Sequence, residues 1–155
     1  MIKTVSALLV FFFLMQGCGY QSIHKIDKTN FTIIRFETNG DEKISRDLAR
    51  NFEKLQINQG SKNRYELITN SQINKKVDSR NSSGVAENLS IYLIIKISVI
   101  ENGMIIGEKS FQENSNYVNL VNKFELHQYE KIILKNLTAG IIKKISLYIS
   151  SLSDY

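Results

Sequence analysis

LSIYLIIKISVI, residues 89–100, has the clearest strand pattern in this chain. Its Leu, Ile and Val residues recur at every second position from Leu89 to Val99, so in a strand they share one face. The other face, from Ser90 to Ile100, is only partly polar, and we expect it to meet a partner or a cover as well. Asn102-Gly103 follows, and both residues tolerate the positive φ of a two-residue hairpin turn. The sequence therefore predicts a hairpin whose second strand runs from Met104 to about Tyr117.

Upstream of this hairpin, a strand and a helix are predicted in succession. Asn30–Glu37 is rich in β-branched and aromatic residues, which favours a strand of about eight residues. Asn39 with Glu42 three positions later resembles a capping box, and Asp41 adds negative charge to the first helical turn. We expect Gln59-Gly60 to end this helix. Apolar residues recur in it at helical spacing and are expected to face the core: Ile44, Leu48, Phe52 and Leu55.

Between this helix and the hairpin lies one more extended segment. Arg64–Asp78 alternates loosely, and we expect an interruption near Asn70-Ser71. Arg80–Asn88 reads as a polar loop around Gly84.

The C-terminal part is predicted to be one long helix. Asn122 with Glu125 forms a second capping-box pattern, and Val121 and Leu126 are placed as its hydrophobic staple. The helix is expected to reach about Ser150, a length of about 42 Å. Its expected core stripe is Tyr129, Ile132, Ile133, Leu137, Ile141, Ile145, Tyr148, Ile149 and Leu152.

The predicted order is strand, helix, strand, strand, strand, helix. A strand–helix–strand unit favours a right-handed crossover and a parallel pair, while the hairpin is antiparallel. The economical arrangement is an α+β two-layer sandwich, with two helices packed on one face of a mixed four-stranded sheet. We assign residues 30–155 to this single domain.

The N-terminus has the features of a targeting segment. Val5–Met15 is an apolar run of about 11 residues, too short for a membrane span of roughly 20 but suited to a signal peptide. Gln16-Gly17-Cys18 ends this run and resembles the lipobox of bacterial lipoproteins, in which the cysteine receives a diacylglycerol and becomes the mature N-terminus. The resemblance implies a signal peptide over residues 1–17, lipid on Cys18 and a tether over residues 18–29. The alternative is an ordinary signal peptide followed by an incidental cysteine.

Few residues in the chain suggest chemistry. A single cysteine excludes an intramolecular disulfide framework and a cysteine-based zinc finger, and His24 and His127 lie too far apart for a local metal motif. No phosphate-binding glycine loop occurs, and we explain Glu125 and Glu130 by capping and solvation. We therefore predict no catalytic residue, no metal and no cofactor beyond the covalent lipid. The net charge of +5 is spread out, so no nucleic-acid partner is predicted.

Three basic residues form the one candidate binding cluster. Lys75, Lys76 and Arg80 lie at the end of the second extended segment, where ammonium and guanidinium groups would pair with phosphates of an anionic glycolipid. The alternative is a solvated strand end.

Several segments together resemble a known family. They are Cys18-Gly19-Tyr20, the strand Phe31–Phe36, Arg64-Tyr65-Glu66-Leu67, the Asn102-Gly103 hairpin, Ser115-Asn116-Tyr117, and the helix containing Ile141–Ile145. In order and spacing they resemble the lipopolysaccharide-assembly lipoproteins, the LptE family, in its divergent alphaproteobacterial form.

The resemblance implies a non-enzymatic lipoprotein at the periplasmic face of the outer membrane. Members plug the LptD β-barrel translocon, help it assemble and deliver lipopolysaccharide to the outer leaflet. A lipoprotein that activates a cell-wall synthase is the main alternative, although only about a dozen residues separate Cys18 from the first strand. A lipid-linked hydrolase ranks third, because neither histidine has an evident catalytic partner.

Overall fold

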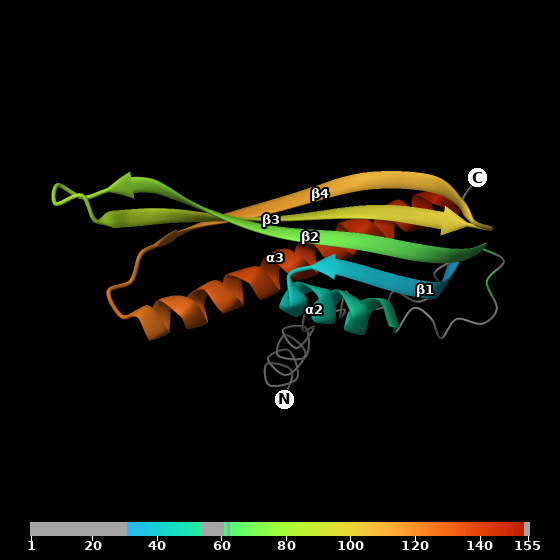
Figure 1. Cartoon of the computed structure of the whole chain (residues 1–155), viewed down its shortest axis with the longest axis horizontal. Helices are drawn as coiled ribbons and strands as arrows, with labels where there is room; N and C mark the ends of the chain where they lie inside the picture. The colour runs from blue at the N-terminus through green and yellow to red at the C-terminus, as the bar shows by residue number, and fades with distance from the viewer. Residues whose placement is uncertain (1–30, 54–60, 62, 154–155) are drawn as a thin grey trace, which may run out of the picture.

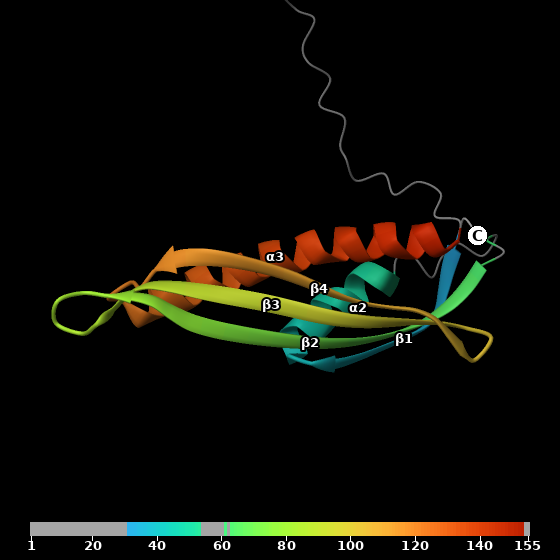
Figure 2. The same cartoon turned by 90° about the horizontal axis from the view of Figure 1, so that it is seen from above.

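The computed structural model describes residues 31–53, 61 and 63–153. Within that part the chain forms four strands and two helices: β1 (Phe31–Gly40), α2 (Glu42–Glu53), β2 (Asn63–Arg80), β3 (Ala86–Glu101), β4 (Met104–Val118) and α3 (Lys123–Leu152). The sheet order is β1-β2-β3-β4, with β1 parallel to β2 and the other two pairings antiparallel. Both helices lie on the same face of the sheet (Figures 1 and 2). The predicted α+β two-layer sandwich with a mixed sheet is confirmed.

The alternation in β3 builds the core as predicted. Ile91, Leu93, Ile95, Ile97 and Val99 are at most 2% exposed, because they face the helices from the third of the four strands. Helix α2 covers the β1 side with its own buried stripe, and α3 covers the β3–β4 side. The predicted hairpin turn is also confirmed, with φ of 51° at Asn102 and 80° at Gly103.

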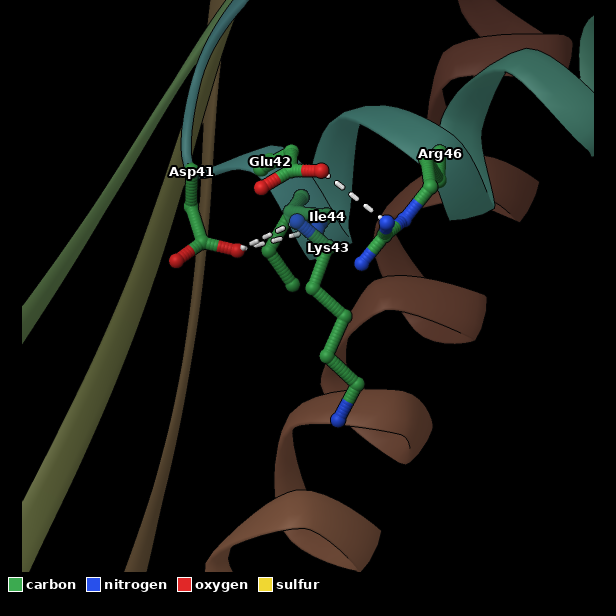
Figure 3. Close-up of polar contacts among 5 residues, drawn as sticks. All are labelled: Asp41, Glu42, Lys43, Ile44 and Arg46. Carbon is green, nitrogen blue, oxygen red and sulfur yellow. Dashed lines mark hydrogen bonds and ion pairs between the residues drawn. The ribbon is translucent and has the colours of Figure 1, made fainter.

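Helix α2 begins differently from the capping-box prediction (Figure 3). Asn39 and Gly40 belong to β1, where they pair with Asn70 and Ser71 of β2. The N-cap acceptor is Asp41, whose Oδ1 accepts hydrogen bonds from the backbone amides of the second and third residues that follow it, both at 3.0 Å. The capping box of Asn39 was therefore wrong, because strand pairing takes that residue into the sheet.

The expected interruption of β2 near Asn70-Ser71 was also wrong. Ser71 pairs with Gly40 on one side and Ile95 on the other, so its backbone is held in the sheet from both sides. Its hydroxyl group accepts from the Asp41 amide at 3.0 Å, which satisfies a polar group in a residue only 4% exposed. The strand consequently runs unbroken for 18 residues.

The loop predicted for Arg80–Asn88 is shorter in the structure. Arg80 ends β2 and Ala86 begins β3, which leaves a turn of residues 81–85. The Asn81 Oδ1 accepts hydrogen bonds from the amides of Ser83 and Val85, both at 3.0 Å. This side chain supplies the acceptor that closes a tight turn, so β2 and β3 extend further than expected.

Helix α3 begins at the predicted cap. Asn122 is the N-cap, its side chain accepts from the amides of Phe124 and Glu125, and its Nδ2 donates to Glu125 Oε1 at 3.1 Å. The staple was wrong, because Val121 is 97% exposed while Leu126 is buried against the sheet.

The core stripe of α3 is only partly as predicted. Ile133, Ile141, Ile145 and Ile149 are buried, whereas Tyr129 and Ile132 are 45% and 57% exposed. The buried line proceeds largely in four-residue steps, each turning about 40° beyond a full circle of the helix. A straight helix lying on a twisted sheet must change its contacting side in this way. The first part of the buried line is therefore Leu126 and Glu130 instead.

Three predictions lie outside the described residues. They are the lipid attachment at Cys18 with its signal peptide and tether, the core position of Leu55, and the helix end at Gln59-Gly60.

Candidate functional site

Strands β2, β3 and β4 extend beyond the end of β1, so one half of the sheet has four strands and the other half has three. Strand β1 pairs with β2 only from Asn63 to Ser71. Beyond Ser71, residues 72–80 of β2 continue with β3 and β4 as a three-stranded ribbon, which we call the distal ribbon (Figure 1). The first half of α3 lies against it, through Leu126, Ile133 and Tyr117 of β4.

The three predicted phosphate contacts all lie on the distal ribbon, but the structure does not bring them to one face. Lys75 and Lys76 are consecutive strand residues and point to opposite faces. Lys75 lies on the face covered by α3, and its Nζ is 2.6 Å from Glu130 Oε2. Arg80 Nη1 donates to the backbone oxygen of Gly84 at 2.9 Å, while Lys76 is exposed on the open face. A shared phosphate contact by all three stays a prediction, and the pairing of Lys75 competes with it.

A buried carboxylate is the polar centre of the distal ribbon. Glu130 is 8% exposed and accepts from two donors, the Tyr117 hydroxyl at 2.6 Å and the Lys75 ammonium at 2.6 Å. These partners come from α3, β4 and β2, so the three side chains join one helix to two strands. We call them the Glu130 cluster. The explanation of Glu130 by solvation was wrong, because the side chain is buried and paired. The sequence around Glu130 gave no sign of this, since Lys75 lies 55 positions away.

The protonation states in this cluster follow from its geometry. Burial by itself would raise the pKa of the Glu130 carboxyl, but the hydrogen bonds from Lys75 and Tyr117 and the nearby positive charge outweigh it. The pKa of Glu130 therefore lies below its ordinary value of 4.5. Burial, followed by the bond to Glu130 and its charge, raises the pKa of Tyr117, which remains a protonated donor. The cluster is a link between the two layers in which each side chain has a partner.

The face of the sheet opposite the helices is open (Figure 2). Its side chains include Asn, Gln, Ser, Lys and Glu, with Tyr92 and Ile94 half-buried in the middle. A shallow hollow on this face, in the four-stranded half of the sheet, is lined mainly by polar side chains. Within it, Ser98 Oγ donates a hydrogen bond to Glu108 Oε1 at 2.9 Å. The expectation that this face meets a partner is compatible with its exposure, and no part of the described chain covers it.

The described residues offer neither a metal-binding cluster nor a membrane-spanning helix. Residues 31–53, 61 and 63–153 contain no group of three His, Cys, Asp or Glu side chains placed to hold a metal ion. In the same residues, neither helix is both long and apolar enough to cross a membrane.

Comparison with known proteins identifies the fold. No protein-family profile and no curated protein matches the sequence. Among solved structures, rare lipoprotein B from Shewanella oneidensis superposes with a TM-score of 0.58 at 12% identity, over 76% of this chain and 94% of that one. Lipoprotein B from Nitrosomonas europaea gives 0.56 at 13% identity, over 83% and 90%.

A third structure agrees with these two. A protein described as a lipoprotein from Caulobacter crescentus CB15 gives a TM-score of 0.54 at 14% identity, over 81% of this chain and 92% of that one. Each match covers nearly the whole of the other protein, so the similarity concerns the complete domain and not a shared sub-motif. The chain has the fold of rare lipoprotein B.

Proposed function

We propose that this protein is an outer-membrane lipoprotein, anchored by lipid on Cys18, that plugs an LptD-type β-barrel and assists the delivery of lipopolysaccharide to the outer leaflet. The strongest support for this function is the combination of the fold with the position of the cysteine. A chain with the fold of rare lipoprotein B has its only cysteine at the end of an apolar N-terminal run. The function is non-enzymatic, consistent with a polar cluster in which each group is already paired.

The open face of the sheet supports a partner with a polar wall. The lumen of an outer-membrane barrel is polar, whereas its outer surface is apolar. Side chains such as Asn70, Gln72 and Asn74 project from β2 toward the side away from the helices. The amide groups on this face could form hydrogen bonds with either donors or acceptors of the barrel wall, and its Lys and Glu side chains would stay hydrated in a wet lumen.

Co-purification tests the barrel partnership. The full-length protein, carrying a C-terminal tag, is extracted in mild detergent from its native membrane. We expect a β-barrel of the outer membrane to accompany it in fixed proportion. Recovery of the protein without any barrel, or in proportion to a cell-wall synthase, would refute the plug function and favour the synthase-activator alternative.

Lipid attachment needs its own experiment. Cys18→Ala removes the thiol that accepts the diacylglycerol, and we expect the protein to leave the membrane fraction. Mass spectrometry of the native N-terminus should show an acylated cysteine. An unmodified thiol in a protein that still fractionates with the membrane would contradict the anchor.

Binding of glycolipid phosphate is the third part of the proposal. Lys76 and Arg80 retain exposed surface on the distal ribbon. Lys76→Ala with Arg80→Ala should therefore weaken binding to lipopolysaccharide micelles more than Lys135→Ala with Lys143→Ala, which removes the same two charges at exposed positions of α3. Equal effects of the two changes would show that only net charge matters.

A further inference from the structure

The β3–β4 hairpin ends in a group of exposed apolar side chains. Met104 is 68% exposed, Ile105 61% and Ile106 37%. A bulge in the β3–β4 pairing places Ile105 opposite Ile100, so these two side chains share the open face of the sheet. We call Ile100 and residues 104–106 the apolar tip.

The apolar tip lies at the end of the molecule where the described chain begins. Phe31 pairs with Asn63 at the start of β2, and Glu66, only three residues further, pairs with Ile100. The hairpin turn is therefore level with Phe31 and two strands away, a separation of about 10–15 Å at the usual strand spacing. Figures 1 and 2 both show the start of β1, the end of α3 and the β3–β4 turn at this end.

The length of chain before Phe31 determines which surface this end meets. Phe31 is 13 residues beyond Cys18, and 13 residues span at most about 45 Å even when fully extended. The turn at residues 81–85 lies at the other end of β2, about 55 Å from Asn63. A lipid on Cys18 thus holds the apolar tip near the bilayer at a much higher effective concentration than the distal turn.

We propose that the apolar tip inserts into the interfacial layer of the membrane that holds the lipid anchor. Transfer of exposed Met and Ile side chains from water to the boundary between headgroups and acyl chains is favourable, because it buries their apolar surface. Glu101 pairs with Met104 and limits the depth, because a carboxylate is costly in the hydrocarbon layer. This contact rests on the proposed lipid at Cys18 and concerns the anchored protein without its barrel partner, since the barrel wall would separate a domain seated in the lumen from the lipid. It gives the molecule a fixed orientation, with the distal ribbon pointing away from the bilayer.

The lone cysteine makes a direct test possible. In the lipidated protein the Cys18 sulfur is blocked, so Ile105→Cys introduces a single thiol for an environment-sensitive fluorophore. The matched control is Val85→Cys in the distal turn, at 57% exposure against 61% for Ile105. Both labelled proteins are reconstituted into vesicles of phosphatidylethanolamine and phosphatidylglycerol, and flotation measures anchoring independently of the fluorophore.

We expect floated protein labelled at 105 to show a blue-shifted emission, protection from aqueous iodide and quenching by nitroxide lipids. The same fluorophore at position 85 should show none of these. Floated protein with an aqueous signal at 105 would overturn the tip insertion and leave the anchor intact. Equal insertion at both positions would overturn the fixed orientation, because the molecule would then lie along the bilayer. Protein that does not float would refute the anchor, and the insertion with it.

Discussion

Tyr117→Phe is a precise test of the Glu130 cluster, because it removes one hydroxyl group and leaves the ring in place. That hydroxyl donates at 2.6 Å to a carboxylate that is 8% exposed. A hydrogen bond to a charged group contributes about 1.5–3 kcal/mol to stability, against 0.5–1.5 kcal/mol for a neutral pair. We expect Tyr117→Phe to lower the free energy of unfolding by about 2 kcal/mol at pH 7.

The effect should depend on pH in a definite direction. The pKa of Glu130 is lowered in the folded protein, so its carboxylate stabilises the fold above the unfolded pKa near 4.5. That contribution is lost as the pH falls through the lower, folded pKa. Once Glu130 is protonated, the bond from Tyr117 becomes a neutral one. The cost of Tyr117→Phe should then fall to about half.

The assay is urea denaturation of the detergent-solubilised protein, followed by far-UV circular dichroism at pH 7 and at a series of values below 4.5. Tyr129→Phe is the matched control, because Tyr129 is 45% exposed and touches the Tyr117 ring edge-on with centroids 6.3 Å apart. It should change stability by less than about 0.5 kcal/mol. A cost of Tyr117→Phe that is the same at every pH, or is matched by Tyr129→Phe, would refute the reasoning.

Three further changes test the fold, each by the same urea assay. Gly40→Ala should be strongly destabilising, since φ is +101° and a Cβ would lie 2.0 Å from a backbone oxygen of β2. Gly84 is the control, because its φ is also positive, at +80°, but a Cβ there would meet nothing within 4 Å. Gly84→Ala should therefore cost only about 1 kcal/mol. Equal costs would contradict the close approach of β1 to β2. Asp41→Ala should cost about 1 kcal/mol through loss of the α2 N-cap, and Asp41→Asn should restore most of it. Ile141→Ala should cost about 2–5 kcal/mol because the side chain is fully buried, while Ile132→Ala should be nearly neutral. Comparable costs of the two changes would instead support the stripe predicted from sequence, which contains both residues.

Much of the architecture could be predicted because its signals are local. The period-two pattern of residues 89–100 identified both the strand and its buried face. Asn102-Gly103 specified the turn, since only residues that tolerate positive φ fit there. Asn122 was identified as a cap from a pattern spanning four residues. Each of these features depends on neighbours close in sequence, which is why one sequence sufficed.

The errors share a different origin, which is competition between a local signal and a distant contact. Asn39 has the chemistry of a cap, but pairing with β2 draws it into β1 and leaves the cap to Asp41. Ser71 suggested a break in β2, but strands on both sides hold its backbone extended. In each case hydrogen bonds to a segment remote in sequence outweighed the residue's own preference.

The sequence alone determined the composition of the layers: which segments are strands, which are helices, and which face of β3 is apolar. Only the tertiary structure decided how α3 is rotated on the sheet, and therefore that Glu130 is buried while Ile132 is not. Helical periodicity fixes relative positions around an axis, but the twist of the sheet fixes which side meets it. The same long-range packing brought Lys75 to Glu130 and placed the apolar tip level with Phe31, relations that no local pattern encodes.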